Sequence, residues 1–137
     1  MIELINAAIT ANLQQRVKNE SRRSFLDPAI YARECKTVHI NIGRQTGKTT
    51  AIAQLCRAND LIVFSNTNIA DMFRHANNNV SRFATVVTIN QLRNMFNTHN
   101  LCFDYVWIDE PNMCENKVDT NLIYEYVAAD LFVKLGE

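Results

Sequence analysis

The sequence predicts an α/β fold in three layers, in which a mainly parallel central sheet carries helices on both faces. Short apolar runs, typical of fully buried strands, alternate along the chain with segments of helical periodicity. Strands that are separated by helices pair in parallel through right-handed crossovers, and this arrangement places a ligand at the carboxyl ends of the strands. The length suits one such core, so residues 1–137 are expected to form a single domain.

The beginning of the chain is expected to be helical. Apolar residues recur at helical spacing, which predicts an amphipathic helix over residues 2–18. Asp27 followed by Pro28 is typical of a helix start, with an N-cap and a proline at the first helical position. A short helix is therefore expected over residues 28–35, and the two helices make up the N-terminal part of the domain, residues 1–35.

Residues 36–113 are expected to form the core of the domain. Strands are predicted where apolar and β-branched residues cluster, at residues 38–42, 61–65, 84–89 and 103–108. Helices are predicted after the first three strands, ending near residue 59 in the first case and spanning residues 69–76 and 91–96 in the others. The asparagine run at residues 77–79 is expected to form a loop.

The C-terminal part, residues 114–137, is expected to end in a helix. Ile123, Val127 and Leu131 lie four residues apart, as the positions on one face of a helix do. No internal repeat or low-complexity linker divides the chain.

A glycine-bracketed segment directly after the first predicted strand has the composition of a phosphate-binding P-loop. It consists of Gly43, Arg44, Gln45, Thr46, Gly47, Lys48, Thr49 and Thr50. Such a loop turns consecutive backbone N–H groups inward, at the positive end of a helix dipole, where they hold a di- or triphosphate. Gly47 lets the main chain approach the phosphates, Lys48 is expected to reach the β and γ oxygens, and the Thr49 hydroxyl is expected to ligate Mg²⁺.

The loop departs from the usual spacing G-x-x-x-x-G-K-[ST], because Gly43 lies one residue later than the first glycine of that pattern. The strand before the loop and the helical pattern after it therefore carry part of the evidence. The structural alternative is a glycine turn beside a solvated lysine. The motif favours binding of ATP or another nucleoside triphosphate.

The fourth predicted strand ends in two carboxylates, as a Walker B strand does. Asp109 and Glu110 follow a buried apolar run, and Pro111 then stops the strand. At the carboxyl end of this strand Asp109 is expected to hold Mg²⁺ and Glu110 to polarise the attacking water. The alternative is an ordinary acidic turn after a strand, for which this tripeptide is common chemistry.

The composition is that of a globular protein, with 47% hydrophobic, 9% aromatic and 20% charged residues. No apolar run approaches the roughly 20 residues that a membrane span requires. The N-terminal segment, with Glu3 and Asn6 inside its apolar pattern, does not resemble a signal peptide. We therefore expect no membrane partner and a cytoplasmic location, which is the host cytoplasm if the protein is viral.

The cysteines and histidines lack the spacing of a metal site. There is no C-x-x-C pair, so the cysteines are expected to be reduced residues of the apolar core. The cysteines and histidines that lack metal-site spacing are Cys35, Cys56, Cys102, Cys114, His39, His75 and His99.

The formal net charge is zero, but its distribution along the chain is uneven. Residues 16–48 contain eight bases and three acids, whereas residues 104–137 contain eight acids and two bases. One interpretation is a basic face that meets an acidic face of a neighbouring copy in a homo-oligomer, or that meets a nucleic-acid backbone. The alternative is that both regions are simply solvated surface.

The P-loop, with Arg44 and Gln45 inside it, resembles the variant Walker A of the large terminase subunits, the ATP-driven motors that package viral DNA. The resemblance covers roughly residues 36–113. The order of strands and helices in this segment is also similar to that of helicases of superfamilies 1 and 2. Three further segments match. They are Ser65-Asn66-Thr67 after the second strand, Thr88-Ile89-Asn90-Gln91-Leu92-Arg93 after the third strand, and Asp109-Glu110 after the fourth strand.

The resemblance implies that Lys48 and Thr49 handle the phosphates and Mg²⁺, that Asp109 holds the metal and that Glu110 activates water. It further implies that Arg44 reaches toward the γ-phosphate. In the additional-strand class of P-loop ATPases, a later strand lies between the P-loop strand and the Walker B strand. No such strand is expected here unless residues 124–132 are extended, so the two key strands are expected to pair directly or a partner to fill the gap.

Three functions are compatible with these motifs. The first is a compact Mg²⁺-dependent nucleoside triphosphatase related to a packaging or helicase motor. The second is a non-hydrolytic nucleotide-binding module that acts by binding a viral or host protein. The third is a small phosphotransferase, although the sequence lacks an arginine-rich lid.

Overall fold

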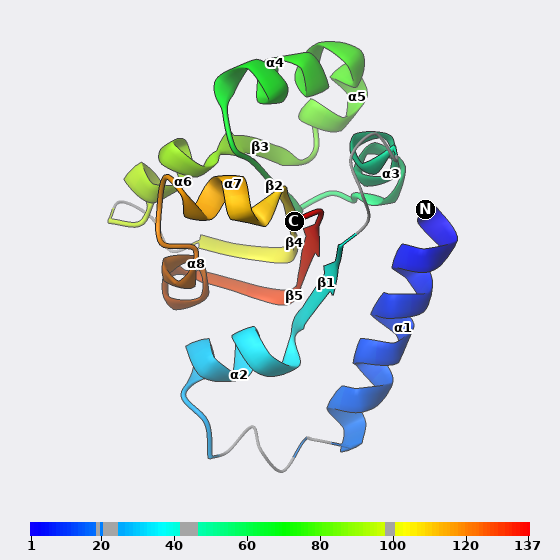
Figure 1. The fold of residues 1–137 in the computed structure, drawn as a ribbon, viewed down its shortest axis with the longest axis vertical. Coiled ribbons are helices and arrows are strands. Elements are labelled where there is room, and N and C mark those ends of the chain that lie inside the picture. Colours follow the sequence, from blue (N-terminus) through cyan, green and yellow to red (C-terminus); the bar gives the residue numbers. More distant parts are fainter. Residues whose placement is uncertain (19, 21–24, 42–46, 98–100) are drawn as a thin grey trace.

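The structure, a computed structural model, describes residues 1–18, 20, 25–41, 47–97 and 101–137. These residues form a five-stranded sheet in which every pair of neighbouring strands is parallel, in the order β1-β5-β4-β2-β3 (Figure 1). The strands are β1 (Thr37–Ile40), β2 (Leu61–Phe64), β3 (Thr85–Thr88), β4 (Leu101–Asp109) and β5 (Val127–Leu135). The prediction of an α/β fold with a parallel sheet is confirmed.

Helices precede, separate and follow the strands. They are α1 (Ile2–Lys18), α2 (Pro28–Cys35), α3 (Lys48–Leu55), α4 (Thr67–Ala76), α5 (Asn78–Ser81), α6 (Ile89–Met95), α7 (Pro111–Glu115) and α8 (Asn121–Tyr126). The predicted helices over residues 2–18 and 28–35 are confirmed as α1 and α2. The asparagine run is not wholly a loop, because its last two residues belong to the short helix α5.

The helices cover both faces of the sheet and form two outer layers. Alternate residues of β2 divide between two buried apolar clusters, since successive side chains of a strand point to opposite faces. Ile62 and Phe64 join the cluster that includes Ile5 of α1 and residues of α3, α4 and α5. Leu61 and Val63 join the cluster that includes residues of α2, α6, α7 and α8.

The prediction of a final helix over the C-terminal part is wrong. Residues 121–126 are helical, but Val127–Leu135 form the strand β5, which lies between β1 and β4. The sequence analysis left open that residues 124–132 are extended, and residues 127–132 are: they belong to β5, which separates β1 from β4, so these two strands do not pair directly. Residues four apart share one face in a strand as well as in a helix, so the spacing of Val127 and Leu131 fits both.

The register of the sheet brings three strand ends to one level. Leu135 of β5 is paired with Ile40 of β1 on one side and with Asp109 of β4 on the other. Neighbouring strands lie about 4.8 Å apart, so the ends of β1 and β4 are separated by roughly 10 Å. Ile40, Leu135 and Asp109 thus lie at the same edge of the sheet.

The expectation that the cysteines belong to the apolar core is confirmed for three of the four cysteines. Cys35, Cys56 and Cys114 are buried, whereas Cys102, near the start of β4, is exposed. Burial raises the pKa of Cys114 to about 12 and that of Cys56 to about 11, with nearby carboxylates adding to each shift, so both thiols stay protonated at neutral pH.

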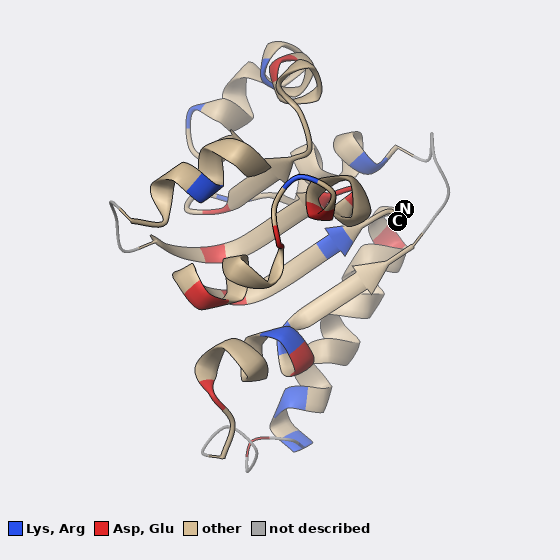
Figure 2. Ribbon diagram, turned by 60° about the vertical axis from the view of Figure 1, so that its left-hand side comes forward, with Lys and Arg blue, Asp and Glu red and all other residues tan. Residues whose placement is uncertain are grey.

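No helix in the described part of the chain has the length and apolar character needed to cross a membrane. Basic residues lie in the last turns of α1 and α2, at Arg16, Lys18 and Arg33 (Figure 2). Whether these bases meet an acidic face of a second copy or a nucleic acid stays a prediction.

Candidate functional site

Lys48 and Glu110 meet at the carboxyl edge of the sheet. Lys48 is the first residue of α3 and follows Gly47, whose φ of 76° is the left-handed conformation that glycine adopts easily. The Lys48 side chain is buried, and its Nζ forms an ion pair with Oε1 of Glu110. The two predicted motifs, 62 residues apart in sequence, therefore come into direct contact.

Glu110 is held in an unusual backbone conformation directly after β4. Its φ of 49° is positive, which is uncommon for a residue other than glycine and is frequent at functional sites. Its N–H donates to the carbonyl of Leu135 at 2.9 Å, and its own carbonyl accepts from the N–H groups of Met113 and Cys114. Glu110 thus turns the chain from β4 into α7, with Pro111 at the first helical position.

Asp109 is buried beside this ion pair with one carboxylate oxygen unpaired. Only 5% of the residue is exposed, and its Oδ1 has no hydrogen-bond partner among the described residues. Burial raises the pKa of Asp109 from 3.8 to about 6, while the charge of Lys48 lowers it and that of Glu110 raises it further. A buried carboxylate without a partner is a position where a bound cation would supply the missing interaction.

The other predicted site residues are only partly described. Thr49 is half-buried and Thr50 is exposed, both in the first turn of α3. A Cβ added at Gly47 would meet nothing within 4 Å, so its positive φ, and not a lack of space, favours glycine here. The predictions for Gly43, Arg44, Gln45 and Thr46 lie outside the described residues.

The matching segments after β2 and β3 begin helices. The Asn66 side chain accepts from the N–H of Ile69 and caps α4. Thr88 and Gln91 form a reciprocal capping box at the start of α6. Their local hydrogen bonds explain why polar residues follow these two strands.

Lys117 joins the segment after β2 to the segment after α7. Its Nζ donates to the carbonyl of Ser65 at 2.5 Å, and Ser65 itself is 1% exposed. This contact ties the ends of β2 and β4 together on the side of the site away from β1.

The sequence analysis missed the end of β5 and the residues that follow it. Leu135, the last residue of β5, and Gly136 and Glu137 lie against Glu110 and against the end of β1. His39 of β1 donates from Nε2 to the carbonyl of Gly136 at 2.8 Å, because a carbonyl can only accept. The available signal was a continuous apolar run, Leu131-Phe132-Val133, followed shortly by a glycine, which is typical of a buried strand and its end.

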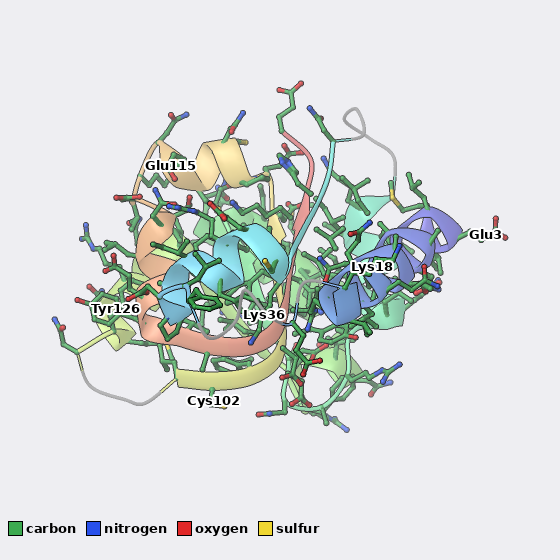
Figure 3. All side chains as sticks on the ribbon, turned by 90° about the horizontal axis from the view of Figure 1, so that it is seen from below. Glu3, Lys18, Lys36, Cys102, Glu115 and Tyr126 are labelled. Atoms are coloured by element: carbon green, nitrogen blue, oxygen red, sulfur yellow. The ribbon has the colours of Figure 1, made fainter. Side chains whose placement is uncertain are left out.

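A separate cavity lies at the opposite edge of the sheet. Its volume is about 590 Å³, and it is lined by residues at the amino ends of β4 and β5 together with Lys36 and the stacked rings of Phe96 and Tyr126. Figure 3 shows this side of the molecule, with Lys36, Cys102 and Tyr126 labelled. Ligands of open parallel sheets bind at the carboxyl ends of the strands, so this cavity does not belong to the site around Lys48.

Among the residues that the structure describes, no group of three or more His, Cys, Asp or Glu side chains is placed to hold a metal ion. A Mg²⁺ ion at Asp109 would need Thr49 and the oxygens of a bound phosphate or water to complete its shell. No protein-family model matches this chain, and no curated protein matches it.

Proposed function

We propose that the chain binds a nucleoside triphosphate with Mg²⁺ at the carboxyl edge of the sheet and hydrolyses it. The observation that carries this proposal is the meeting of Lys48 with Glu110 beside the unpaired oxygen of Asp109. A lysine at a helix start, a buried aspartate and a glutamate next to it are the groups that phosphate, metal and attacking water require.

The sheet order also supports a P-loop fold. In the additional-strand class of P-loop ATPases a strand lies between the P-loop strand and the Walker B strand, and β5 lies between β1 and β4 here. The ends of β1 and β4 are level and one strand apart, at the edge of the sheet where Lys48 meets Glu110. The strand that the sequence did not predict therefore adds to the evidence for this fold.

The residues present fit a Mg²⁺ ion. The Oδ1 atom of Asp109 has no hydrogen-bond partner within the described ranges, and oxygen atoms are the ligands that this ion prefers. Asp109 would hold the ion together with the hydroxyl of Thr49 and the phosphate oxygens. When bound, the ion would supply positive charge that offsets the negative charge of the phosphates.

Each side chain has a defined task in hydrolysis. Lys48 leaves Glu110 and pairs with the phosphate oxygens when the nucleotide binds. Oε1 of Glu110 is then free to accept a proton from the attacking water, whose oxygen forms a bond to the γ-phosphorus while the bond from that phosphorus to the bridging oxygen breaks. The products are a nucleoside diphosphate and inorganic phosphate.

The ion pair of Lys48 with Glu110 thus describes a resting state. As long as Lys48 is bound to Oε1 of Glu110, this oxygen is not available to accept a proton from water. Binding of the triphosphate exchanges one partner of Lys48 for another and releases the base at the same time. Hydrolysis should be slow unless a further positive group lies at the γ-phosphate. We assign the role of this positive group to Arg44 or to an arginine of another subunit.

Release of phosphate from MgATP, measured with malachite green, tests the proposal. Lys48→Ala should lose both nucleotide binding and phosphate release, and Glu110→Gln should keep binding but lose at least 100-fold in rate. Lys18→Ala, at the end of α1, is the matched lysine control and should behave as the wild type. Equal rates from the wild type, Lys48→Ala and Glu110→Gln would contradict hydrolysis at this site.

The relationship to DNA-packaging or helicase motors is part of the proposal. It is supported by the resemblance at Arg44 and Gln45 and by the strand order. Double-stranded DNA should stimulate phosphate release if the chain works as a packaging motor, and single-stranded nucleic acid should do so if it works as a helicase motor. Tight binding of nucleotide without phosphate release would instead favour the non-hydrolytic module.

A further inference from the structure

The end of β5 and the residues that follow it hold the ends of β1 and β4 together. The N–H of Gly136 donates to the carbonyl of Ile40 at 2.9 Å, and the carbonyl of Leu135 accepts from the N–H of Glu110 at 2.9 Å. One residue later, the N–H of Asn112 donates to the carbonyl of Glu137 at 2.7 Å. The backbone of residues 135–137 is therefore fixed to the P-loop strand on one side and to the Glu110 turn on the other.

The two carboxylate oxygens of Glu110 have different partners. Oε1 is paired with Lys48, a side chain that the proposed function requires to move toward phosphate. Oε2 accepts from the backbone N–H of Glu137 at 3.3 Å. The partner of Oε1 is thus exchangeable, whereas the partner of Oε2 belongs to the fixed backbone after β5.

Gly136 allows the carboxylate of Glu110 to lie against the backbone. Its φ of 103° is a conformation that residues with a side chain rarely adopt. A Cβ at this position would lie 2.7 Å from Oε2 and 2.9 Å from Cδ of Glu110, and Cβ atoms essentially never approach other heavy atoms this closely. Since the carboxylate is the far end of a flexible side chain, it would move away rather than resist.

We infer that Gly136 and the backbone N–H of Glu137 are positioning groups for Glu110, an inference that rests on the proposed function. They hold Oε2 in place when Lys48 departs, so that Oε1 alone faces the attacking water. Gly136 leaves free the space that a Cβ would take from the carboxylate, and the N–H of Glu137 is the main-chain donor to Oε2.

The kinetics of MgATP hydrolysis by Gly136→Ala test this inference. Displacement of the carboxylate should lower kcat at least 10-fold, because a general base must lie within hydrogen-bond reach of its proton. KM and the affinity for MgATP, measured by calorimetry, should stay within about twofold of the wild type, since Lys48 and Asp109 are unchanged. Asn59→Ala is the control for backbone strain, because Asn59 also has a positive φ, 69°, and lies outside the site.

A double variant separates an effect through Glu110 from a general defect. In a Glu110→Asp background the shorter carboxylate no longer reaches the position of the added Cβ. Gly136→Ala should then lower kcat by less than about threefold, although it lowers kcat at least 10-fold in the wild-type background. If Gly136→Ala lowered kcat by the same factor in the wild-type and Glu110→Asp backgrounds, the positioning role would be overturned.

Glu137→Pro provides an independent variant, since proline removes the N–H that donates to Oε2. It should also lower kcat at least 10-fold with little change in KM, and it decides the question if Gly136→Ala does not fold. A wild-type rate in either folded variant would overturn the inference while leaving the proposed function intact. Absence of phosphate release from the wild type itself would instead contradict the proposed function and, with it, the positioning role.

Discussion

Asp109 lowers the stability of the folded protein at neutral pH, because its charge is buried and its Oδ1 accepts no hydrogen bond from the part of the chain that the structure describes. The pKa of Asp109 is about 6 in the folded state and 3.8 in the unfolded state. Between these two values the unfolded chain has lost a proton that the folded protein keeps, so stability falls as the pH rises through this window. Above pH 6 the full cost is present, about 2–3 kcal/mol.

Asp109→Asn is therefore expected to stabilise the nucleotide-free protein at pH 7 by about 1–3 kcal/mol, although it should abolish magnesium-dependent activity. Near pH 4 the difference from the wild type should largely disappear, because Asp109 is then protonated in the folded state. Urea unfolding at the two pH values measures both effects. Asp104→Asn, an exposed acid in the same strand, is the control and should change the midpoint little at either pH. A destabilised Asp109→Asn at pH 7 would contradict this account.

The strands β2 and β4 are joined by a buried carboxylate at the start of β2. Asp60 is 1% exposed and accepts hydrogen bonds from the N–H of Arg57 at 2.9 Å, from the N–H of Tyr105 at 3.1 Å and from the indole N–H of Trp107 at 3.1 Å. All three donors would lose their acceptor if this carboxylate were removed. An unsatisfied buried donor costs about 1–3 kcal/mol.

Asp60→Ala should accordingly destabilise the protein by about 3–5 kcal/mol. Thermal unfolding followed by circular dichroism measures this loss. Asp71→Ala is a matched control, since Asp71 pairs with Arg74 only on the exposed surface of α4, and such pairs contribute little. Similar losses from the two variants would show that the Asp60 hydrogen bonds do not contribute as the structure indicates.

Elements whose signal is local could be predicted from the sequence. Helix α2 begins with Asp27 and Pro28, whose capping chemistry depends on neighbouring residues alone. The residues of the Lys48 and Asp109 motifs were found for the same reason, because each motif is contiguous. That Lys48 contacts Glu110 required the fold, since it depends on the sheet register.

Elements whose identity depends on long-range pairing could not be predicted in this way. The strand β5 is a strand because β1 and β4 supply hydrogen-bonding partners on both of its edges, and neither is near it in sequence. The burial of Asp60 and the close approach of Gly136 to Glu110 have the same origin. The sequence shows an aspartate and a glycine at these positions but not what lies against them.

At the scale of the whole molecule, β5 connects the two halves of the proposed site. It pairs with β1 from Thr37 to Ile40 and with β4 along almost its whole length. In the described part of the sheet, β1 has no strand partner other than β5. A weakened β5 should therefore affect both the global stability and the relative placement of Lys48 and Glu110.

Phe132 is the residue at which this dependence is best tested. It is fully buried and lies in register with Thr37 of β1 and Val106 of β4. Its ring packs edge-on against the ring of Tyr124, with the two ring centroids 4.9 Å apart. Phe132→Ala removes a large side chain from the centre of the sheet, so it should cost about 3–5 kcal/mol, a large part of the 5–15 kcal/mol that stabilises a typical domain.

The matched control for Phe132→Ala is Phe25→Ala, because Phe25 is 86% exposed and loses little contact when it is shortened. Thermal unfolding should place the midpoint of Phe132→Ala at least about 10 °C below that of the wild type, and that of Phe25→Ala within a few degrees of it. If β5 were the terminal helix that the residue spacing suggested, position 132 would lie at the edge of the fold and the two variants would differ little. Equal midpoints would therefore contradict the central position of β5 and, with it, the support that this strand gives to the site.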